Sequence, residues 1–343
     1  MKILLVSTMI FCVPPTGTYG GLEGCVEDLA VELIKLGHQV SIVCPKGSNV
    51  PGAELIMPCD PNFADPEGEA YNAYREALEA GKWDICHDHS WAGYPYLSKA
   101  KNLKLKIIHT IHSVRPWVTP PPVKYPCLVG ASKWHAQYIS ATMGVRAEYV
   151  YHGINLDTYK LCTEKDDYLL YCARVTPFKG AHEFVALCKR LGMRGRLVGE
   201  DAYIDREHHA FVRRVMDSCD GRQVIYEGRV GRGSDQMVEL MGKAKAMISP
   251  LLPEYYEIFG LSTIECMACG TPVISTDRGA AAELITPGTG FVIPDIHGLD
   301  EAVRNLDKTS PQVCRARAEQ FDRKFMAENY VKLYERALNN DEW

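Results

Sequence analysis

The sequence lacks a strong excess of charge of either sign, and it lacks a long apolar run. It holds 38 Lys and Arg against 43 Asp and Glu, a formal net charge of -5 over 343 residues. Such a balance gives no general attraction to nucleic acid or to an acidic membrane surface. No segment reaches the roughly 18 unbroken apolar residues of a membrane span. We therefore predict neither a nucleic-acid partner nor a transmembrane segment.

Signs of secretion are also missing. The opening stretch MKILLVSTMIFCVPP has a lysine and an apolar run but no small-residue cleavage site, so we interpret it as a first core strand. The 13 cysteines are odd in number, and several lie in or beside apolar segments. An odd number in a long chain does not suit a disulfide framework. We expect a cytoplasmic protein whose cysteines are small core residues.

The fingerprint of a dinucleotide site is absent as well. The segment TGTYGGLEG, residues 16–24, follows the first strand, but its glycines do not have G-x-G-x-x-G spacing. The second strand ends in CPKG, without an acidic residue for a ribose hydroxyl. We therefore do not expect a nicotinamide-dependent dehydrogenase. A double glycine that opens a helix still suits contact with a ligand, although it also suits an ordinary turn.

Strand and helix patterns alternate along the whole chain. The candidate strands are residues 2–7, 39–44, 84–87, 106–112, 127–132 and 147–153, and then 168–173, 194–199, 223–228, 245–250, 271–276 and 290–293. This alternation predicts parallel sheets with crossover helices. A chain of this length exceeds one hydrophobic core, and the polar stretch DTYKLCTEKDD divides it near residues 155–166.

We therefore predict an α/β protein with two facing Rossmann-like domains. The first covers residues 1–158 and the second residues 159–320. Residues from about 310 to 338 have a helical pattern that could pack across both domains, and we expect the C-terminal helix, 321–343, to return to the first domain. Open parallel sheets bind ligands at the carboxyl ends of their strands, so the chemistry is expected in the cleft between two such domains.

Two glutamates, Glu257 and Glu265, lie eight positions apart in EYYEIFGLSTIECMACGTPVI. On a continuous helix their backbones would be roughly 12 Å apart, whereas paired carboxylates of glycosidases work at about 5 to 10 Å. They are therefore not expected to be one acid and base pair. Gly260 lies where a helix would begin, so the free amides of Phe259, Gly260 and Leu261 could face an anionic or hydroxyl-rich group. Two solvated glutamates on an ordinary helix are the alternative.

A second polar cluster follows the first strand of the second half. The segment CARVTPFKG places Arg174 and Lys179 on a loop that leads into a helix. Two cations at the carboxyl end of a strand suit a diphosphate, because arginine binds two oxygens and lysine acts as a point charge. A basic surface loop is the alternative interpretation.

Taken together, these motifs resemble those of a known family. Glu257 and Glu265, Arg174 and Lys179, YGGLE near the start, HGI at 152–154 and ACGTPVISTDRGAAAELI are similar to a family 4 retaining glycosyltransferase with the GT-B fold. The resemblance covers almost the whole chain. It implies a metal-independent enzyme without a resident cofactor, whose donor substrate is a nucleoside diphosphate sugar.

The resemblance also implies roles for individual residues. Arg174 and Lys179 would bind the donor diphosphate, Glu265 the ribose, and Glu257 with the amides of Phe259, Gly260 and Leu261 the transferred sugar. Gly20 and Gly21 would lie against the phosphates, His112 beside the donor sugar, and Arg229 and Val230 near the base. UDP is the expected nucleotide, with GDP and ADP as alternatives.

This sequence departs from the family pattern at two positions. Gly24 stands where relatives often have a basic residue, which affects the phosphate contacts of the first domain. Ala280 replaces the usual second glycine before Glu283, which affects the backbone near the sugar.

The histidines raise the question of a metal. His87, His89, His109 and His112 have H-x-H and H-x-x-H spacings near two strand ends, and side chains two apart on a strand share a face. No cysteine or carboxylate cluster completes a ligand set, so we predict no metal site. We expect His109 to be a core histidine. The Cys266-x-x-Cys269 pair lacks the setting of a redox motif.

The sequence thus predicts transfer of a hexosyl unit to a hydroxyl acceptor with retention of configuration. The acceptor, a small molecule, lipid or glycan, is open, and the segment 115–126 after His112 is expected to shape it. A nucleotide-sugar epimerase or a phosphorylase with the same architecture is one alternative. A non-catalytic sugar-nucleotide binding subunit is the other.

Overall fold

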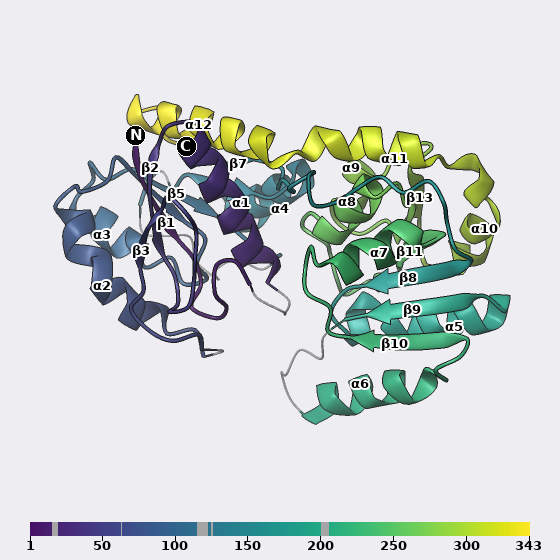
Figure 1. Ribbon diagram of the computed structural model, residues 1–343. Coiled ribbons are helices and arrows are strands. Elements are labelled where there is room, and N and C mark those ends of the chain that lie inside the picture. The colour runs from purple at the N-terminus through teal and green to yellow at the C-terminus, as the bar shows by residue number, and fades with distance from the viewer. Residues whose placement is uncertain (16–19, 63, 115–122, 125, 200–205) are drawn as a thin grey trace. The chain divides into compact units, whose positions relative to one another are not determined.

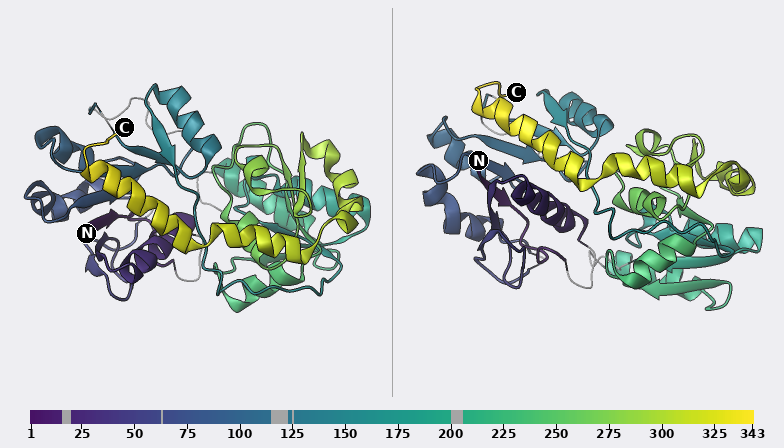
Figure 2. Two further views of the ribbon diagram at one scale, coloured as in Figure 1. Left: turned by 90° about the horizontal axis from the view of Figure 1, so that it is seen from above. Right: turned by 45° about the horizontal axis from the view of Figure 1, so that its top comes forward.

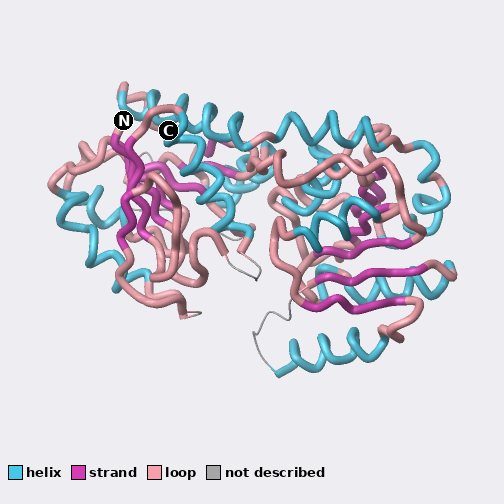
Figure 3. Tube along the Cα trace, in the orientation of Figure 1, coloured by secondary structure: helices cyan, strands magenta, loops and turns pink. Residues whose placement is uncertain are grey.

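The structure is a computed structural model that describes residues 1–15, 20–62, 64–114, 123–124, 126–199 and 206–343. These residues form two compact units, each with its own sheet (Figure 3). The first unit holds residues 1–15, 20–154 and 323–343, and the second holds residues 155–322. Residues 16–19 and most of the predicted acceptor segment 115–126 lie outside the described part.

The first unit is a parallel sheet with helices on both faces (Figure 1). Its strand order is β3-β2-β1-β4-β5-β6-β7. The strands are β1 (Lys2–Val6), β2 (Gln39–Val43), β3 (Glu54–Ile56), β4 (Ile85–Asp88), β5 (Ile107–Thr110), β6 (Leu128–Gly130) and β7 (Ala147–Tyr149). The helices are α1 (Gly21–Lys35), α2 (Glu67–Glu79), α3 (Pro95–Lys101), α4 (Lys133–Met143) and α12 (Arg323–Leu338).

Strand β1 shows why this sheet is covered on both faces. Successive side chains of a strand point to opposite faces. Ile3 and Leu5 pack in a buried cluster with residues of α1 and α12, whereas Leu4 and Val6 pack in another with residues of α2. The apolar run KILLV is therefore buried on both sides, as expected of a central parallel strand.

The second unit repeats this architecture with the strand order β10-β9-β8-β11-β12-β13. The strands are β8 (Tyr168–Cys172), β9 (Arg194–Val198), β10 (Val224–Gly228), β11 (Ala246–Ser249), β12 (Val273–Thr276) and β13 (Gly290–Ile293). The α-helices are α5 (Ala181–Leu191), α6 (Arg206–Ser218), α7 (Asp235–Lys243), α8 (Leu261–Ala268), α9 (Ala281–Leu284), α10 (Leu299–Arg304) and α11 (Pro311–Ala318). Short 3₁₀ helices are η1 (Pro177–Lys179), η2 (Ile296–Gly298), η3 (Leu306–Lys308) and η4 (Glu319–Phe321).

The prediction of parallel α/β sheets is confirmed, and each candidate strand has a counterpart in the structure. Strand β3 was not predicted, because its three residues ELI are too short for a periodic signal. The prediction of one helical segment over about 310–338 is wrong in detail. Turn η4 and the extended residue Asp322 separate α11 from α12.

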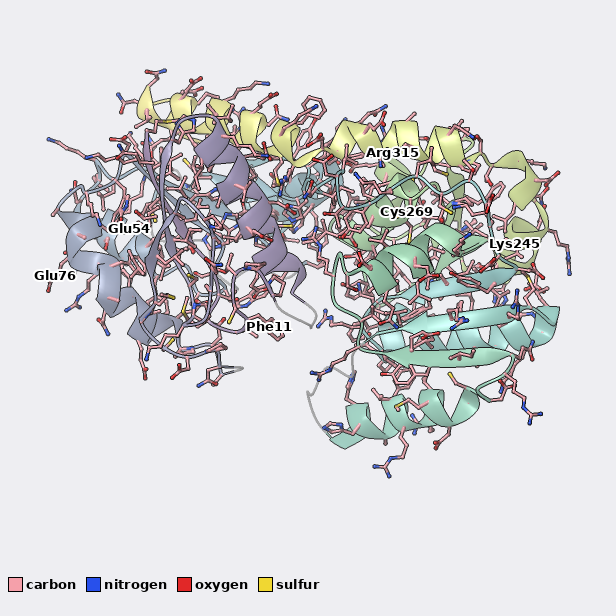
Figure 4. All side chains as sticks on the ribbon, in the orientation of Figure 1. Phe11, Glu54, Glu76, Lys245, Cys269 and Arg315 are labelled. Carbon is pink, nitrogen blue, oxygen red and sulfur yellow. The ribbon has the colours of Figure 1, made fainter. Side chains whose placement is uncertain are left out.

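Those two helices belong to different units. Helix α12 packs on α1 in the first unit, as both views of Figure 2 show. Helix α11 packs on α8 in the second unit. There the Arg315 guanidinium donates to the carbonyl oxygens of Tyr159 (2.6 Å) and Ala268 (3.1 Å), beside Cys269 at the end of α8 (Figure 4). This contact fixes the carboxyl end of α8.

Each sheet has a point where the chain reverses its direction of travel across the strands. In the second sheet β8 lies between β9 and β11, so the chain leaves β8 on one side and later returns to its other side. Ligands of open parallel sheets bind outside the carboxyl ends of the strands at such a switch point. The residues after β8 and β11 are therefore the ones to inspect. Among the described residues, no helix is both long and apolar enough to cross a membrane.

Candidate active site

A pocket lies at the switch point of the second sheet. It is formed at the ends of β8 and β11 and at the start of α8. Its lining residues are Tyr171, Ala173, Lys179, Met247, Ile248, Ser249, Leu251, Glu257, Phe259, Gly260, Ser262, Thr263, Ser275 and Ala281. Four residues predicted from sequence, namely Lys179, Glu257, Phe259 and Gly260, thus meet around one cavity. Leu261, Arg174, Glu265, Arg229 and Val230 belong to the same unit but are not part of this lining.

Lys179 is buried at the end of η1, with an exposed fraction of 7%. Its Nζ atom lies 2.6 Å from Oε2 of Glu257 and 4.6 Å from the ring centroid of Tyr255. The ring of Phe178 stacks on Tyr255 at 5.1 Å. The ammonium group is therefore held between a carboxylate and an aromatic face, both of which attract a cation.

Gly180 explains why the chain can place Lys179 there. It has a left-handed backbone, with φ of 73°, and forms the junction between η1 and α5. A β-carbon at this residue would come well under 3.0 Å from the carbonyl oxygen of Pro250, which follows β11. Only glycine allows the loop after β8 to approach the loop after β11 this closely.

Glu257 is fixed through its backbone. It forms an isolated parallel bridge with Gly279, and the amide of Ala280 donates to the Glu257 carbonyl oxygen at 2.8 Å. Gly279 has a left-handed backbone, with φ of 74°, which favours glycine at this position. Ala280, the residue that departs from the family pattern, has φ of -79° and a fully buried side chain. An alanine therefore fits here without backbone strain.

Helix α8 begins at the pocket. Gly260 is its N-terminal cap, with φ of 96° and ψ of 70°, and Leu261 is its first residue, as predicted. The buried ring of Phe259 packs edge-on against Phe321 at 5.7 Å, which anchors the entry to the helix. The first amides of a helix lack partners within it and carry a partial positive charge. This end of α8 therefore favours an anionic or hydroxyl-bearing ligand.

Glu265 lies farther along α8 and is buried, with an exposed fraction of 4%. Its Oε1 atom accepts a hydrogen bond from Nε of Arg232 at 2.7 Å. The two glutamates thus have different cationic partners, Lys179 for Glu257 and Arg232 for Glu265. That the two are not one acid and base pair stays a prediction.

Arg232 was missed from sequence. The segment GRVGRG, which begins at the last residue of β10, could have indicated it, because it adds a second arginine to a strand end that already has Arg229. Arg229 is exposed and Val230 is half-buried in the same loop. Arg174 is half-buried after β8, and its carbonyl oxygen accepts a hydrogen bond from the Tyr171 hydroxyl at 2.9 Å.

The predicted residues of the first unit follow two of its strands, Gly20 and Gly21 after β1 at the start of α1 and His112 after β5. Gly20 caps α1, and Gly21 is the first residue of that helix. A β-carbon at Gly20 would collide with the ring of Pro15. In the first turn the buried Glu23 accepts a hydrogen bond from the Thr8 hydroxyl at 2.6 Å. Burial raises the pKa of Glu23 to about 7.

His112 follows β5, is half-buried, and contacts the buried imidazoles of His89 and His152. Its Nε2 atom lies 2.9 Å from Nδ1 of His89, and its ring stacks on that of His152 at 5.2 Å. The rings of His87 and His89 are 4.0 Å apart, so the H-x-H spacing does bring them together. Burial, reinforced by the neighbouring imidazoles, holds the pKa of His112 well below its usual value.

The fourth histidine of the predicted set, His109, also has protein partners. His109 is a core residue, as predicted, and contacts the Asp88 carboxylate at 3.2 Å and the Ser90 carbonyl oxygen at 3.0 Å. Within the described part of the chain, no group of three or more His, Cys, Asp and Glu side chains could hold a metal ion.

Comparisons with known proteins agree with this architecture. The family model Glycosyltransferase Family 4 matches residues 19–158, and the model Glycosyl transferases group 1 matches residues 166–308. A glycogen synthase of Mycobacterium tuberculosis is 24% identical, over 93% of this chain and 89% of its own.

Two solved structures show the same fold. Sucrose-phosphate synthase from Thermosynechococcus elongatus has a TM-score of 0.81 at 20% identity, over 99% of this chain and 100% of its own. HepE of Anabaena, in complex with UDP and glucose, has a TM-score of 0.72 at 16% identity, over 98% of this chain and 99% of its own. The two matched family models cover most of both units. The chain belongs to the group 1 and family 4 glycosyltransferases, and it is a glycosyltransferase with the GT-B fold.

Proposed function

We propose that this glycosyltransferase moves a hexosyl unit from a nucleoside diphosphate sugar to a hydroxyl group of an acceptor, with retention of configuration and without a metal ion. The observation that carries the proposal is the Lys179–Glu257 ion pair, held in the switch-point pocket beside the first turn of α8. A cation and a carboxylate side by side suit a ligand in which a phosphate group adjoins a sugar. UDP is the proposed nucleotide, supported by the complex of HepE with UDP and glucose.

Each group in the second unit has a proposed task. Lys179 and Arg174 bind the diphosphate, and the positive end of α8 adds backbone donors. Glu257 accepts hydrogen bonds from sugar hydroxyls, and Glu265 accepts them from the ribose. Arg229 and Val230 contact the base. In the first unit Gly20 and Gly21 approach the phosphates and His112 contacts the sugar.

The reaction then needs positioning and charge stabilisation more than a dedicated base. The bond from the anomeric carbon to the diphosphate oxygen breaks, and the departing oxygen takes up negative charge. Lys179 and Arg174 stabilise that charge. The acceptor oxygen attacks the same face of the sugar and gives its proton to the departing phosphate. These two cations take the part that a divalent metal would otherwise play.

A reducing, cytoplasmic location is part of the proposal. All 13 cysteines are free thiols, and burial raises the pKa of several of them, such as Cys188 to about 12. Such thiols are poor nucleophiles and act as small core residues.

The proposal is tested by incubating the full chain with a panel of UDP-, GDP- and ADP-sugars in the presence of EDTA. We expect one donor to raise the melting temperature and to be hydrolysed slowly, and NMR should show that the released sugar first appears with the anomeric configuration of the donor. Inversion, or dependence on added metal, would contradict the mechanism. A new sugar nucleotide formed without acceptor would indicate an epimerase, and tight donor binding without any turnover would indicate a binding subunit.

A further inference from the structure

His89 and His112 share one partly buried hydrogen bond in the first unit. His89 follows β4 and has an exposed fraction of 2%. Its Nδ1 atom lies 2.9 Å from Nε2 of His112. Burial holds the pKa of both rings well below the usual value, so both are neutral at physiological pH. A neutral imidazole has one N–H and one acceptor nitrogen, so one ring must donate and the other must accept.

The direction of this hydrogen bond follows from the other nitrogen of His89. That Nε2 atom is buried and has no hydrogen-bond partner among the described residues. If it carried the proton, a buried N–H group would be left without an acceptor, which is rarer and more costly than an acceptor without a donor. The proton of His89 therefore lies on Nδ1. His89 donates, and Nε2 of His112 accepts.

His87 does not change this assignment. Its ring lies 4.0 Å from that of His89, but both of its nitrogens are engaged elsewhere. Nδ1 lies 2.7 Å from the Tyr334 hydroxyl and Nε2 lies 2.8 Å from the Thr110 hydroxyl. His87 therefore packs against His89 without hydrogen bonding to it, so the proton of His89 stays on Nδ1.

The consequence for His112 is direct. Since its Nε2 accepts from His89, its single proton is on Nδ1. Among the described residues no partner of that Nδ1 atom is present, and His112 is only half-buried. An N–H donor is therefore available to a ligand, whereas the basic nitrogen of the ring is occupied.

We propose that His89 is a positioning residue that fixes His112 as the Nδ1–H tautomer, so that His112 meets an oxygen atom of the donor sugar as a neutral hydrogen-bond donor and not as a base. The part of this inference that concerns the sugar rests on the proposed function. The tautomer itself is a property of the protein without substrate.

The tautomer can be read from the full chain labelled with ¹⁵N. Long-range proton–nitrogen NMR spectra distinguish a protonated ring nitrogen from an unprotonated one, and His112→Asn identifies the signals of His112. We expect a protonated Nδ1 and an unprotonated Nε2 in the native protein. His89→Leu, which removes the donor without adding a charge, should abolish this preference. His89→Asn places an amide N–H near the position of Nδ1 and should restore it.

Kinetics connect the tautomer with the reaction. His89→Leu should lower kcat/KM for the donor about tenfold, the order expected for one lost hydrogen bond. His89→Asn should recover part of that loss, and thermal unfolding shows whether each variant is folded. If the role of His89 is purely structural, the activity of its variants should follow their thermal stability and not the tautomer of His112.

The outcomes separate this inference from the proposed function. A protonated Nε2 in native His112, or an unchanged tautomer in His89→Leu, would overturn the inference even if His112→Asn lost activity. If the tautomer is as expected but His112→Asn turns over normally, the assignment of His112 to the donor sugar is wrong and the tautomer result stands.

Discussion

Gly279 lies against the backbone of Glu257, with which it forms an isolated parallel bridge. A β-carbon at Gly279 would collide with the Glu257 carbonyl oxygen and would come within 2.8 Å and 2.9 Å of the amide nitrogen and carbonyl carbon of Glu257. The position of Glu257 therefore depends on a glycine 22 residues later in the chain. The neighbouring Ala280 completes the contact by donating its amide to the same carbonyl oxygen.

Gly279→Ala is expected to displace Glu257 and to lower both stability and turnover. The substitution adds a collision to the strain of a left-handed backbone at a residue with φ of 74°, and we expect a loss of roughly 2 kcal/mol or more in the free energy of unfolding. The matched control is Ala280→Gly, where φ is ordinary and the loss should be about 1 kcal/mol. Urea unfolding measures the stability of both variants, and kcat/KM measures their turnover. Equal effects for the two variants would show that close approach at Gly279 does not position Glu257.

Lys179→Met is expected to abolish transfer while leaving the second unit folded. The methionine keeps most of the apolar length of lysine but removes the charge that faces Glu257 and the proposed diphosphate. Loss of one cation that stabilises a departing phosphate is expected to lower kcat by at least about a hundredfold. Arg174→Ala should have the same consequence. Lys308→Met, at an exposed position of the same unit, is the matched control. Near-normal turnover in Lys179→Met would remove Lys179 from the mechanism.

The fold was predictable because its signals are local. The runs around Ile3 and Leu170 are apolar and buried on both faces of a strand, and glycines or polar loops separate them from amphipathic helices. The break between α11 and α12 was not predictable. Residues 319–322 contain neither proline nor glycine, and the two helices differ in what they pack on, α11 on α8 of the second unit and α12 on α1 of the first.

The candidate site was predictable in part. Gly260 and Leu261 stand where the sequence places a helix start, and Lys179 meets Glu257 because both follow neighbouring strands of one sheet. The partners of Arg232 and His89 could not be predicted from the sequence. Contacts between a loop and a helix, or between two strand ends, depend on three-dimensional packing and not on the spacing of residues along the chain. The structure supplies these two contacts.

Glu23→Gln is expected to stabilise the protein more at pH 8 than at pH 5. The pKa of Glu23 is raised from 4.5 to about 7 by burial. The folded state thus holds a proton between these values that the unfolded state releases, so this group lowers the free energy of unfolding as the pH rises from about 4.5 to 7, by roughly 3 kcal/mol in all. Glutamine is always neutral and can still accept from Thr8. Glu76→Gln, at an exposed position of α2 (Figure 4), is the control. A gain independent of pH would mean that Glu23 is ionised in the folded protein.

Arg232→Met is expected to weaken nucleotide binding through Glu265. Arg232 donates to Oε1 of Glu265 at 2.7 Å, so its removal leaves a buried carboxylate without its cation and without a fixed orientation. We expect affinity for UDP to fall about tenfold and affinity for inorganic pyrophosphate to stay unchanged, since the phosphate groups are bound elsewhere. Both are measured by calorimetry.

A double-mutant cycle shows whether the arginine acts through the glutamate. In a Glu265→Gln background there is no carboxylate to orient, so Arg232→Met should have little further effect on UDP affinity. Comparison of the affinities for UDP and 2′-deoxy-UDP then locates the interaction. If Glu265 binds the ribose, the native protein should bind UDP more tightly than 2′-deoxy-UDP, and the Arg232→Met variant should bind the two equally. If Arg232→Met weakens the binding of pyrophosphate as much as the binding of UDP, the guanidinium contacts the phosphates directly. The ion pair with Glu265 then belongs only to the protein without ligand.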